Sequence, residues 1–208
     1  MNRLMTLGQD LRWRRELIQR ANLPRGRSLL LDLGGGTGDV GLTALRQNPA
    51  IVPIEIDFTI EMMLRGKTRP GAESLLWSAA DVLAIPFDDN VFDAVVSGFL
   101  LRNVTDIDQV LSEQYRVLEH GGRIVTLDTT RPRENLFSPL IRFHMHTIIP
   151  FLGRLLTGEA EAYTYLPDSS EGFLPAEDLA ACMSAAGFEE VRFRRLMFGT
   201  IAIHWGRK

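Results

Sequence analysis

Apolar runs that suit buried strands alternate along this chain with apolar residues at helical spacing. The strand signals are continuous because a strand covered on both faces of a sheet needs no polar alternation. They lie at 29–33, 51–57, 75–79, 92–97 and 122–128. The intervening helical signals lie at 9–21, 39–47, 59–65 and 105–118. This alternation predicts βαβ units, and therefore a mostly parallel sheet with helices on both faces.

The last third of the chain departs from that alternation. A helix is predicted from Pro175, at its first position, to Ala186, and Gly187 ends it. Strands at 191–198 and 200–205 follow, joined by a turn at Gly199. So short a connection leaves no room for a crossover helix, so these strands must pair antiparallel. We expect an α/β, Rossmann-like, seven-stranded sheet that is mostly parallel and ends in an antiparallel hairpin.

The borders of two elements carry more specific expectations. Pro53 has no backbone N–H, and it predicts a bulge or an edge-like start for the second strand. Thr105 or Asp106 is expected to cap the fourth helix, because a side-chain oxygen there accepts from a free backbone N–H. The pair Gly121-Gly122 is expected to end that helix.

Composition is that of one soluble globular domain, which we place at 1–208. The 208 residues are 45% hydrophobic and 24% charged, and they contain neither repeats nor a linker. A net charge of −3 gives no reason to expect nucleic acid, whose phosphates call for a concentrated basic surface. The one cysteine, Cys182, excludes an internal disulfide and falls on an apolar helical stripe, where packing is its expected role.

Neither a secretory signal nor a membrane span is predicted. The first residues, MNRLMTLGQDLRWRR, spread charges where a signal would have an apolar run. The longest apolar stretch, 136–156, is interrupted by Pro139, Arg142, His144, His146, Pro150 and Arg154. We therefore expect a cytoplasmic protein that is soluble or peripheral at the inner face of a membrane.

The stretch 29–38, LLLDLGGGTG, is the most informative motif. An apolar run ends at an acid and four glycines follow closely, as where a first strand feeds a tight turn and a helix at a ligand site. Residues 36–41 also satisfy the dinucleotide fingerprint G-x-G-x-x-G, but Asp32 would repel a pyrophosphate. That carboxylate suits a ligand with an ammonium and a sulfonium group. S-adenosylmethionine (SAM) is such a ligand.

Acids end three of the predicted strands: Asp32, Asp57 and Asp128. In an open α/β sheet those ends face the ligand crevice. Asp57 lies 19 positions after Gly38, about where an acid accepts the hydroxyls of a ribose. Any one of these acids could instead be a helix cap, but together with the glycine turn they favour a site.

Residues for an adenine ring follow the second and third strands. Phe58 and Met62 come directly after Asp57, and either could cover one face of the ring. Asp81 could accept from the adenine amino group, with the backbone around Val82 helping.

The chain resembles the class I SAM-dependent methyltransferases and, more narrowly, the quinone-ring C-methyltransferases of ubiquinone and menaquinone biosynthesis. The matching segments cover nearly the whole chain. They are LDLGGGTGDV (31–40), IDFTIEMM (56–63), ADVLAIPFDDNVFDAV (80–95), LRNVTD (101–106), YRVLEHGGRIVTLD (115–128), PFLG (150–153), AYTY (162–165) and AGFEEV (186–191). The LRNVTD stretch and the Tyr-containing lid distinguish this subfamily from other methyltransferases.

The resemblance implies where each ligand binds. It implies SAM contacts from Gly34, Gly36, Gly38, Asp57 and Asp81, with Asp32 near the methionine end. It places a quinol precursor beneath residues 129–174, an insertion that covers the substrate. It gives Arg102 and Asn103 as the substrate-facing pair, and Tyr163 and Tyr165 as candidates for ring contacts or lid closure.

Several of these residues have a second interpretation. Arg102 could stabilise a phenolate or hold a water that takes the phenolic proton, or it could form a salt bridge that fixes its loop. Tyr163 and Tyr165 could equally pack in the core. His144 and His146, two positions apart on a helix, point away from each other and predict no metal, although one could act as a base. The apolar face of 137–155 suits either a polyprenyl tail or packing on the domain.

We therefore predict a SAM-dependent C-methyltransferase that methylates the ring of a quinone or quinol precursor, of the demethylmenaquinol or ubiquinol-precursor type. The acceptor could instead be another small aromatic or secondary metabolite. A nicotinamide-dependent oxidoreductase and a SAM-binding protein without catalysis are the remaining alternatives. The last would follow if the pocket stays open, because relatives carry residues before the matched start that help to close it. The resemblance is compatible with peripheral membrane contact and with a homodimer.

Overall fold

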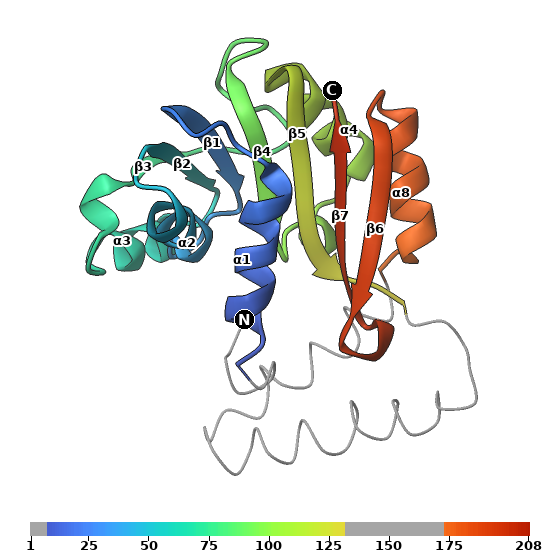
Figure 1. The fold of residues 1–208 in the computed structure, drawn as a ribbon, viewed down its shortest axis with the longest axis horizontal. Coiled ribbons are helices and arrows are strands. Elements are labelled where there is room, and N and C mark those ends of the chain that lie inside the picture. The colour runs from blue at the N-terminus through green and yellow to red at the C-terminus, as the bar shows by residue number, and fades with distance from the viewer. Residues whose placement is uncertain (1–7, 132–172) are drawn as a thin grey trace.

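The computed structural model describes residues 8–131 and 173–208, which build one seven-stranded sheet (Figure 1). Its strands are β1 (Ser28–Leu33), β2 (Ile51–Asp57), β3 (Leu76–Ala79), β4 (Phe92–Gly98), β5 (Leu118–Thr129), β6 (Glu189–Leu196) and β7 (Ile201–Arg207). Their order across the sheet is β3-β2-β1-β4-β5-β7-β6. The first five strands are parallel, and β7 pairs antiparallel with both β5 and β6. The α/β sheet with a C-terminal antiparallel hairpin, predicted from the sequence, is confirmed.

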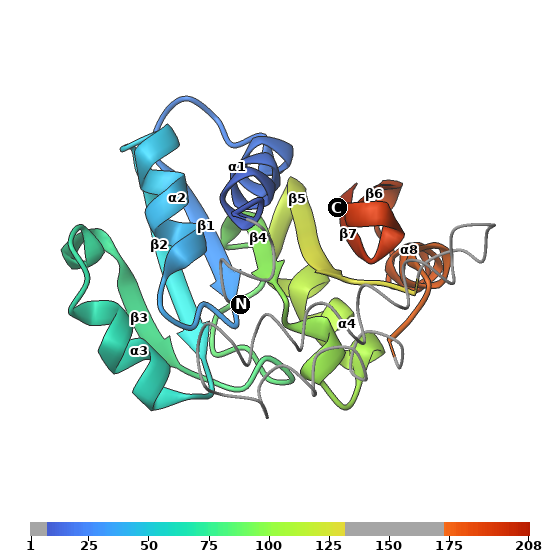
Figure 2. The ribbon, with the colours of Figure 1, turned by 90° about the horizontal axis from the view of Figure 1, so that it is seen from below.

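Helices cover both faces of this sheet (Figure 2). On one face lie α1 (Asp10–Ala21) and α2 (Asp39–Gln47), and on the other lie α4 (Ile107–Val117) and α8 (Ala176–Ala185). The remaining helix, α3 (Ile60–Lys67), follows β2 and packs beside it. A short 3-10 turn at Leu101–Asn103 follows β4, and another at Met197–Gly199 connects β6 to β7.

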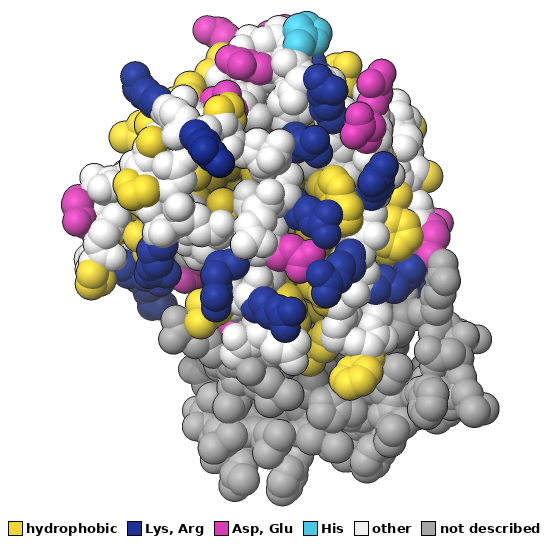
Figure 3. All heavy atoms as spheres, viewed as in Figure 1, with side chains coloured by type: hydrophobic (Ala, Val, Ile, Leu, Met, Phe, Trp, Pro, Cys, Tyr) yellow, Lys and Arg dark blue, Asp and Glu magenta, His cyan; other side chains and the backbone are white. Residues whose placement is uncertain are grey.

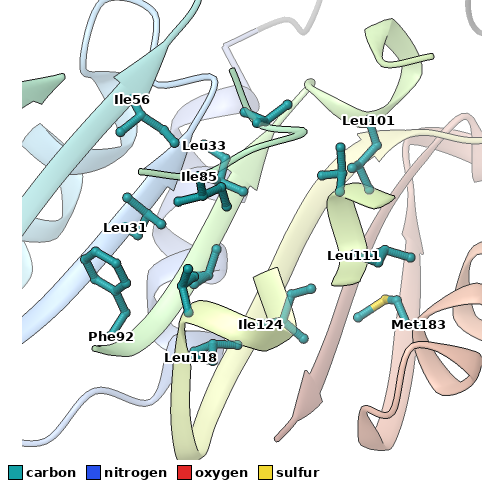
Figure 4. Packing of buried hydrophobic residues seen from close by; sticks show 14 of the residues in the cluster. Leu31, Leu33, Ile56, Ile85, Phe92, Leu101, Leu111, Leu118, Ile124 and Met183 are labelled. Atoms are coloured by element: carbon teal, nitrogen blue, oxygen red, sulfur yellow. The ribbon is translucent and has the colours of Figure 1, made fainter. Parts of the chain in front are cut away.

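Alternate residues of the central strands enter opposite cores, which explains their continuous apolar pattern. The core on the α4 and α8 face contains Leu31, Leu33, Ile56, Phe92, Leu111, Leu118, Ile124 and Met183 (Figure 4). The core on the α1 and α2 face contains Trp13, Leu17, Leu30, Val40, Ala94, Val96, Val125 and Ile203. Cys182 packs partly buried against the first of these cores, as its place on the helical stripe predicted.

The fourth helix begins as predicted but ends earlier. Asp106 is its N-cap, and its Oδ1 accepts from the backbone N–H of Gln109 at 2.9 Å. The prediction that Gly121-Gly122 ends the helix is wrong, because α4 ends at Val117. The next residue, Leu118, is fully buried and already pairs with β4. The two glycines instead lie where the pairing of β5 with β4 is interrupted, and Gly121 adopts a φ of +86° there.

Pro53 lies in the first part of β2, residues 51–53, which pairs with β1 alone. It stands opposite Leu30 of β1, whereas pairing with β3 begins one residue later, at Ile54 and Leu76. The missing N–H therefore removes no bond from the sheet. The edge-like start is confirmed, and β1 and β2 pair without a bulge. None of the described helices is long and apolar enough to span a membrane.

Candidate active site

A cavity of about 580 Å³ opens where β1, β2 and β4 end, at the carboxyl edge of the sheet. Its volume lies in the range of pockets that hold small molecules and cofactors. Most residues predicted for the site line it. These are Asp32, Gly34, Gly36, Asp57, Phe58, Met62, Asp81, Val82, Arg102 and Asn103. Sequence positions up to 71 residues apart therefore meet at one edge, as the parallel topology requires.

The glycine turn between β1 and α2 forms the floor of the cavity. Gly34, Gly36 and Gly38 have φ of +67°, +56° and +75°, values that side-chain-bearing residues rarely adopt. Gly38 caps α2 and does not line the cavity. A Cβ there would lie 2.7 Å from a methyl carbon of Leu75 and 2.9 Å from the Trp77 ring, so this glycine allows close packing behind the turn.

Asp57, at the end of β2, fixes the position of that turn. Its Oδ2 accepts from the backbone N–H of Gly36 at 2.8 Å, and its Oδ1 accepts from that of Thr59 at 2.7 Å. Each carboxylate oxygen can accept a second hydrogen bond. The half-buried carboxylate is therefore positioned by the backbone and can still accept from a ligand hydroxyl in the cavity.

The wall predicted for an adenine ring lies open beside Asp57. Phe58 is 80% exposed and Met62 is 40% exposed, which large apolar side chains in a folded core are not. Asp81 is exposed, and within the described part of the chain only its Oδ1 accepts a hydrogen bond, from the backbone N–H of Leu83 at 2.9 Å. Val82 beside it is buried. These residues offer an apolar surface and a free acceptor, the features that a purine with an amino group needs.

Asp32 is buried against a second acid that sequence reasoning missed. It pairs in register with Glu55 of β2, and the two residues are 1% and 0% exposed. Within residues 8–131 and 173–208, no backbone or basic donor reaches their carboxyl oxygens. Burial raises the pKa of Asp32 to about 7, and burial together with the charge of Asp32 raises the pKa of Glu55 well above its usual value. The only available signal was a polar residue inside the apolar run IVPIEID.

Arg14 is a charged residue of the cavity wall that the sequence did not reveal. This buried arginine of α1 forms ion pairs with Asp10 and, at 3.4 Å, with Asp39 at the start of α2. Burial opposes ionisation of Asp39, but Arg14 and Arg69 outweigh it and lower the pKa of Asp39. Arg14 therefore ties α1 to the glycine turn and brings a positive charge to the cavity wall.

Across the cavity, Arg102 is held by Asp128 at the end of β5. Its Nη1 donates to Asp128 Oδ1 at 3.0 Å, and its backbone N–H donates to Oδ2 at 3.3 Å. Burial raises the pKa of Asp128, and the nearby Arg102 opposes that rise. The salt bridge that fixes the loop, one of the two roles expected for Arg102, is thus present. Arg102 also lines the cavity, so this ion pair leaves its proposed part in the chemistry open to test.

The remaining predicted residues divide into described and undescribed ones. Asn103 is exposed at the cavity edge, and its amide donates to the carbonyl of Phe99 at 3.2 Å. Tyr163 and Tyr165 lie outside the described residues, as do His144, His146, the apolar face of 137–155 and nearly all of the 129–174 insertion. Their roles remain predictions. No cluster of three potential metal ligands occurs among residues that the structure describes.

Comparison with characterised proteins yields close relatives along the full chain. The chain is 44% identical over 208 residues to the ubiquinone/menaquinone biosynthesis C-methyltransferase UbiE of Desulfotalea psychrophila, covering 100% of this chain and 84% of that protein. It is 41% identical over 208 residues to the demethylmenaquinone methyltransferase of Thermus thermophilus, covering 99% of this chain and 94% of that protein.

Solved structures agree on the fold. The [4+2]-cyclase SpnF superposes with a TM-score of 0.72 at 21% identity, over 95% of this chain and 81% of that one. Phosphoethanolamine N-methyltransferase 2 of Haemonchus contortus, in complex with S-adenosyl-L-methionine, also gives 0.72, at 13% identity over 95% of this chain and 52% of that one. At these identities the likeness shows the fold alone.

A family model extends the agreement to every residue. The model of the ubiE/COQ5 methyltransferase family matches residues 1–208. The match confirms the resemblance drawn from the sequence motifs, and with it the predicted class of enzyme, a methyltransferase that uses SAM. By this match and by the sequence of its relatives, the chain belongs to the ubiE/COQ5 methyltransferase family.

Proposed function

We propose that this protein transfers a methyl group from SAM to a ring carbon of a quinol precursor of the demethylmenaquinol or ubiquinol-precursor type. The observation that carries the proposal is the match to the ubiE/COQ5 family over the whole chain. Relatives at 41–44% identity bear the names of enzymes with this activity. The cavity at the strand ends, with its acids and glycine turn, supports the same activity.

SAM fits the donors and acceptors on one side of the cavity. Asp57 would accept from the ribose hydroxyls, with its orientation set by the N–H groups of Gly36 and Thr59. Phe58 and Met62 would cover the adenine, and Asp81 would accept from its amino group. Asp32 would face the ammonium end. When bound, SAM supplies an electrophilic methyl group on a sulfonium.

The other side of the cavity suits the acceptor ring. A hydroquinone hydroxyl that loses its proton places charge on the neighbouring ring carbon, which would then attack the methyl group. The bond from that methyl to sulfur would break as the new carbon–carbon bond forms, with its electron pair left on sulfur, and loss of the proton from the methylated ring carbon would restore the aromatic ring. Arg102, fixed by Asp128, would stabilise that phenolate electrostatically or hold the water that takes its proton. Asn103 would contact the same ring, and we propose that residues 129–174, including Tyr163 and Tyr165, cover it. The protein's main contribution is then alignment and exclusion of water.

The donor side can be tested by calorimetry with SAM, S-adenosylhomocysteine (SAH) and NADH. Micromolar binding of SAM and SAH without NADH binding is the expected result. NADH binding alone would favour the oxidoreductase. Binding of SAM without methylation of any acceptor would favour a non-catalytic protein.

The acceptor side can be tested with radiolabelled methyl transfer. We expect transfer to a short-chain demethylmenaquinol or a ubiquinol precursor, and none to a catechol of similar size. Preference for the small aromatic would favour the alternative acceptor class.

We propose in addition that the protein contacts membranes peripherally, where prenylated quinols reside. Support comes from basic side chains gathered on the face formed by α1 and β6 (Figure 3), including Arg12, Arg15, Arg20 and Arg194. Exposed Ile60 and Leu64 lie on α3. Co-flotation with vesicles containing anionic lipids, but not with neutral vesicles, is the expected result.

Analytical ultracentrifugation of the same sample tests the homodimer.

A further inference from the structure

Glu55 is a buried acid that neither the fold nor the proposed function has so far used. Its side chain is fully buried in a strand whose other interior residues are apolar, apart from the acid that ends it. A buried carboxyl without a partner costs several kcal/mol, so such a residue needs an explanation. Its neighbour in the sheet is Asp32, whose carboxyl is equally buried.

The Glu55 carboxyl occupies a fixed position beneath the glycine turn. A Cβ placed on Gly35 or on Gly41 would overlap one of its oxygens. Because the turn and the first residues of α2 close over it, this carboxyl does not line the cavity, whereas Asp32 does. The pair therefore has an inner member, Glu55, and an outer member, Asp32, that faces the ligand.

The charges around the pair leave room for only one negative charge on it. Among the residues that the structure describes, Arg14 of α1 is the one cation that acts on Asp32, and it is already paired with Asp10 and Asp39. Asp39 of α2 acts unfavourably on both carboxyls, and Asp57 of β2 acts unfavourably on Asp32. Two neighbouring carboxylates in such surroundings share a proton, since two like charges cannot both be kept away from water.

We propose that Glu55 is a positioning residue for the methyl donor: it keeps the shared proton and donates a hydrogen bond through it to Asp32, so that Asp32 presents a carboxylate to the ammonium group of SAM. The inference rests on the proposed binding of SAM in this cavity. The in-register placement of the two buried carboxyls and the raised pKa values of both agree with it. In the free protein at pH 6, Asp32 is itself largely protonated, so arrival of the ammonium displaces a proton from the pair.

Two substitutions separate a proton donor from a space filler. Glu55→Gln keeps an N–H donor of the same size toward Asp32, and we expect the Kd for SAH at pH 7 to stay within about threefold of wild type. Glu55→Leu removes the donor, which makes Asp32 harder to ionise. Its Kd should rise at least ~10-fold at pH 7, and the difference from wild type should shrink as pH rises toward 8.

Thr126→Val is the matched control, because Thr126 is also fully buried in a strand but does not line the cavity. It should bind SAH like wild type. Thermal melts establish that each variant is folded before binding is compared. Equal losses in Glu55→Gln and Glu55→Leu, or no pH dependence of the loss in Glu55→Leu, would overturn the inference.

A second measurement does not depend on any Glu55 variant. Calorimetry of SAH binding to the wild type at pH 6, in two buffers of different ionisation enthalpy, counts the protons exchanged. We expect release of up to one proton, and none in Asp32→Asn. Binding without proton release would overturn the inference alone, whereas absence of SAM and SAH binding to the wild type would overturn the proposed function.

Discussion

Asp32 and Asp128 occupy equivalent places in the sheet, yet their surroundings are opposite. Each ends a parallel strand and each is 1% exposed. Asp128 accepts from the Arg102 side chain and from two backbone N–H groups, whereas Asp32 faces the carboxyl of Glu55. The protein itself neutralises the first carboxylate. The second has no such donor among the described residues, and we propose that a cation of the ligand takes that place.

The two acids are equally buried, so exposure does not distinguish them. The charges around them do. At Asp128, Arg102 opposes the pKa rise that burial causes, and the ion pair joins the loop after β4 to β5. At Asp32, burial dominates, and the pKa rises to about 7. The role of a buried carboxyl at a strand end is therefore indicated mainly by whether the protein places a positive charge beside it.

The largest expected effect on stability comes from removing the charge of Asp128, the acid that is paired with an arginine. Asp128→Asn leaves the guanidinium of Arg102 without its counter-charge, and should lower the free energy of unfolding by about 3 kcal/mol. Asp32→Asn, the matched change at the other strand end, should leave that free energy unchanged or raise it. Urea denaturation at pH 7.5 measures both, and equal losses would show that the two environments are equivalent.

A second test asks whether the paired arginine is more than structural. Arg102→Ala should lower kcat about 100-fold through loss of phenolate stabilisation, while the Kd for SAM stays within about threefold. The measurement is turnover per folded molecule, with exposed Arg192→Ala as the control. Full turnover in Arg102→Ala would show that Arg102 serves only to form its salt bridge with Asp128.

A third test extends the comparison to Asp57, the strand-end acid held by backbone N–H groups. Asp57→Ala removes the ribose acceptor and frees the glycine turn, and should raise the Kd for SAM about 30-fold, or about 2 kcal/mol. Calorimetry compares it with Asp88→Ala, an exposed acid away from the cavity. Equal affinity in Asp57→Ala and wild type would remove Asp57 from the cofactor site.

The smallest expected effect is a pH dependence of stability that Asp32 causes. Its ordinary pKa is 3.8, so between about pH 4 and pH 7 the folded chain keeps a proton that the unfolded chain has lost. Stability from this group is complete below pH 4 and falls as pH rises through about 7. Relative to Asp32→Asn, the wild type should lose about 1 kcal/mol per pH unit between pH 5 and 7. Parallel curves would contradict the raised pKa.

Strands and connections whose form depends only on nearby residues could be predicted from the sequence. The apolar run before Asp32 forms a strand because both faces are covered, and the hairpin after α8 must be antiparallel because Gly199 leaves no room for a crossover. The end of α4 could not be placed in this way. Two glycines mark a helix end in isolation, but here pairing of Leu118 with β4 decides it.

The two charged residues in and beneath the cavity that escaped prediction depend on neighbours far along the chain. Glu55 becomes notable only once the register places it beside Asp32, and a carboxyl inside a strand has no periodic signature. In the sequence Arg14 is one of several arginines on a helix, and its ion pair with Asp39 at the start of α2 becomes visible only in the folded structure. By contrast, the acids at strand ends and the glycine turn were predictable, because parallel topology alone collects them at one edge.

The closure of Gly35 and Gly41 over the Glu55 carboxyl limits the routes by which this sequence can change. Either glycine could accept a side chain only after residue 55 had become small, while a small residue there would leave a void until a glycine had been replaced. Substitutions at these three positions are thus epistatic: their order matters, and a library that varies them singly will find only losses. Engineering of this turn should begin at residue 55 and vary all three together.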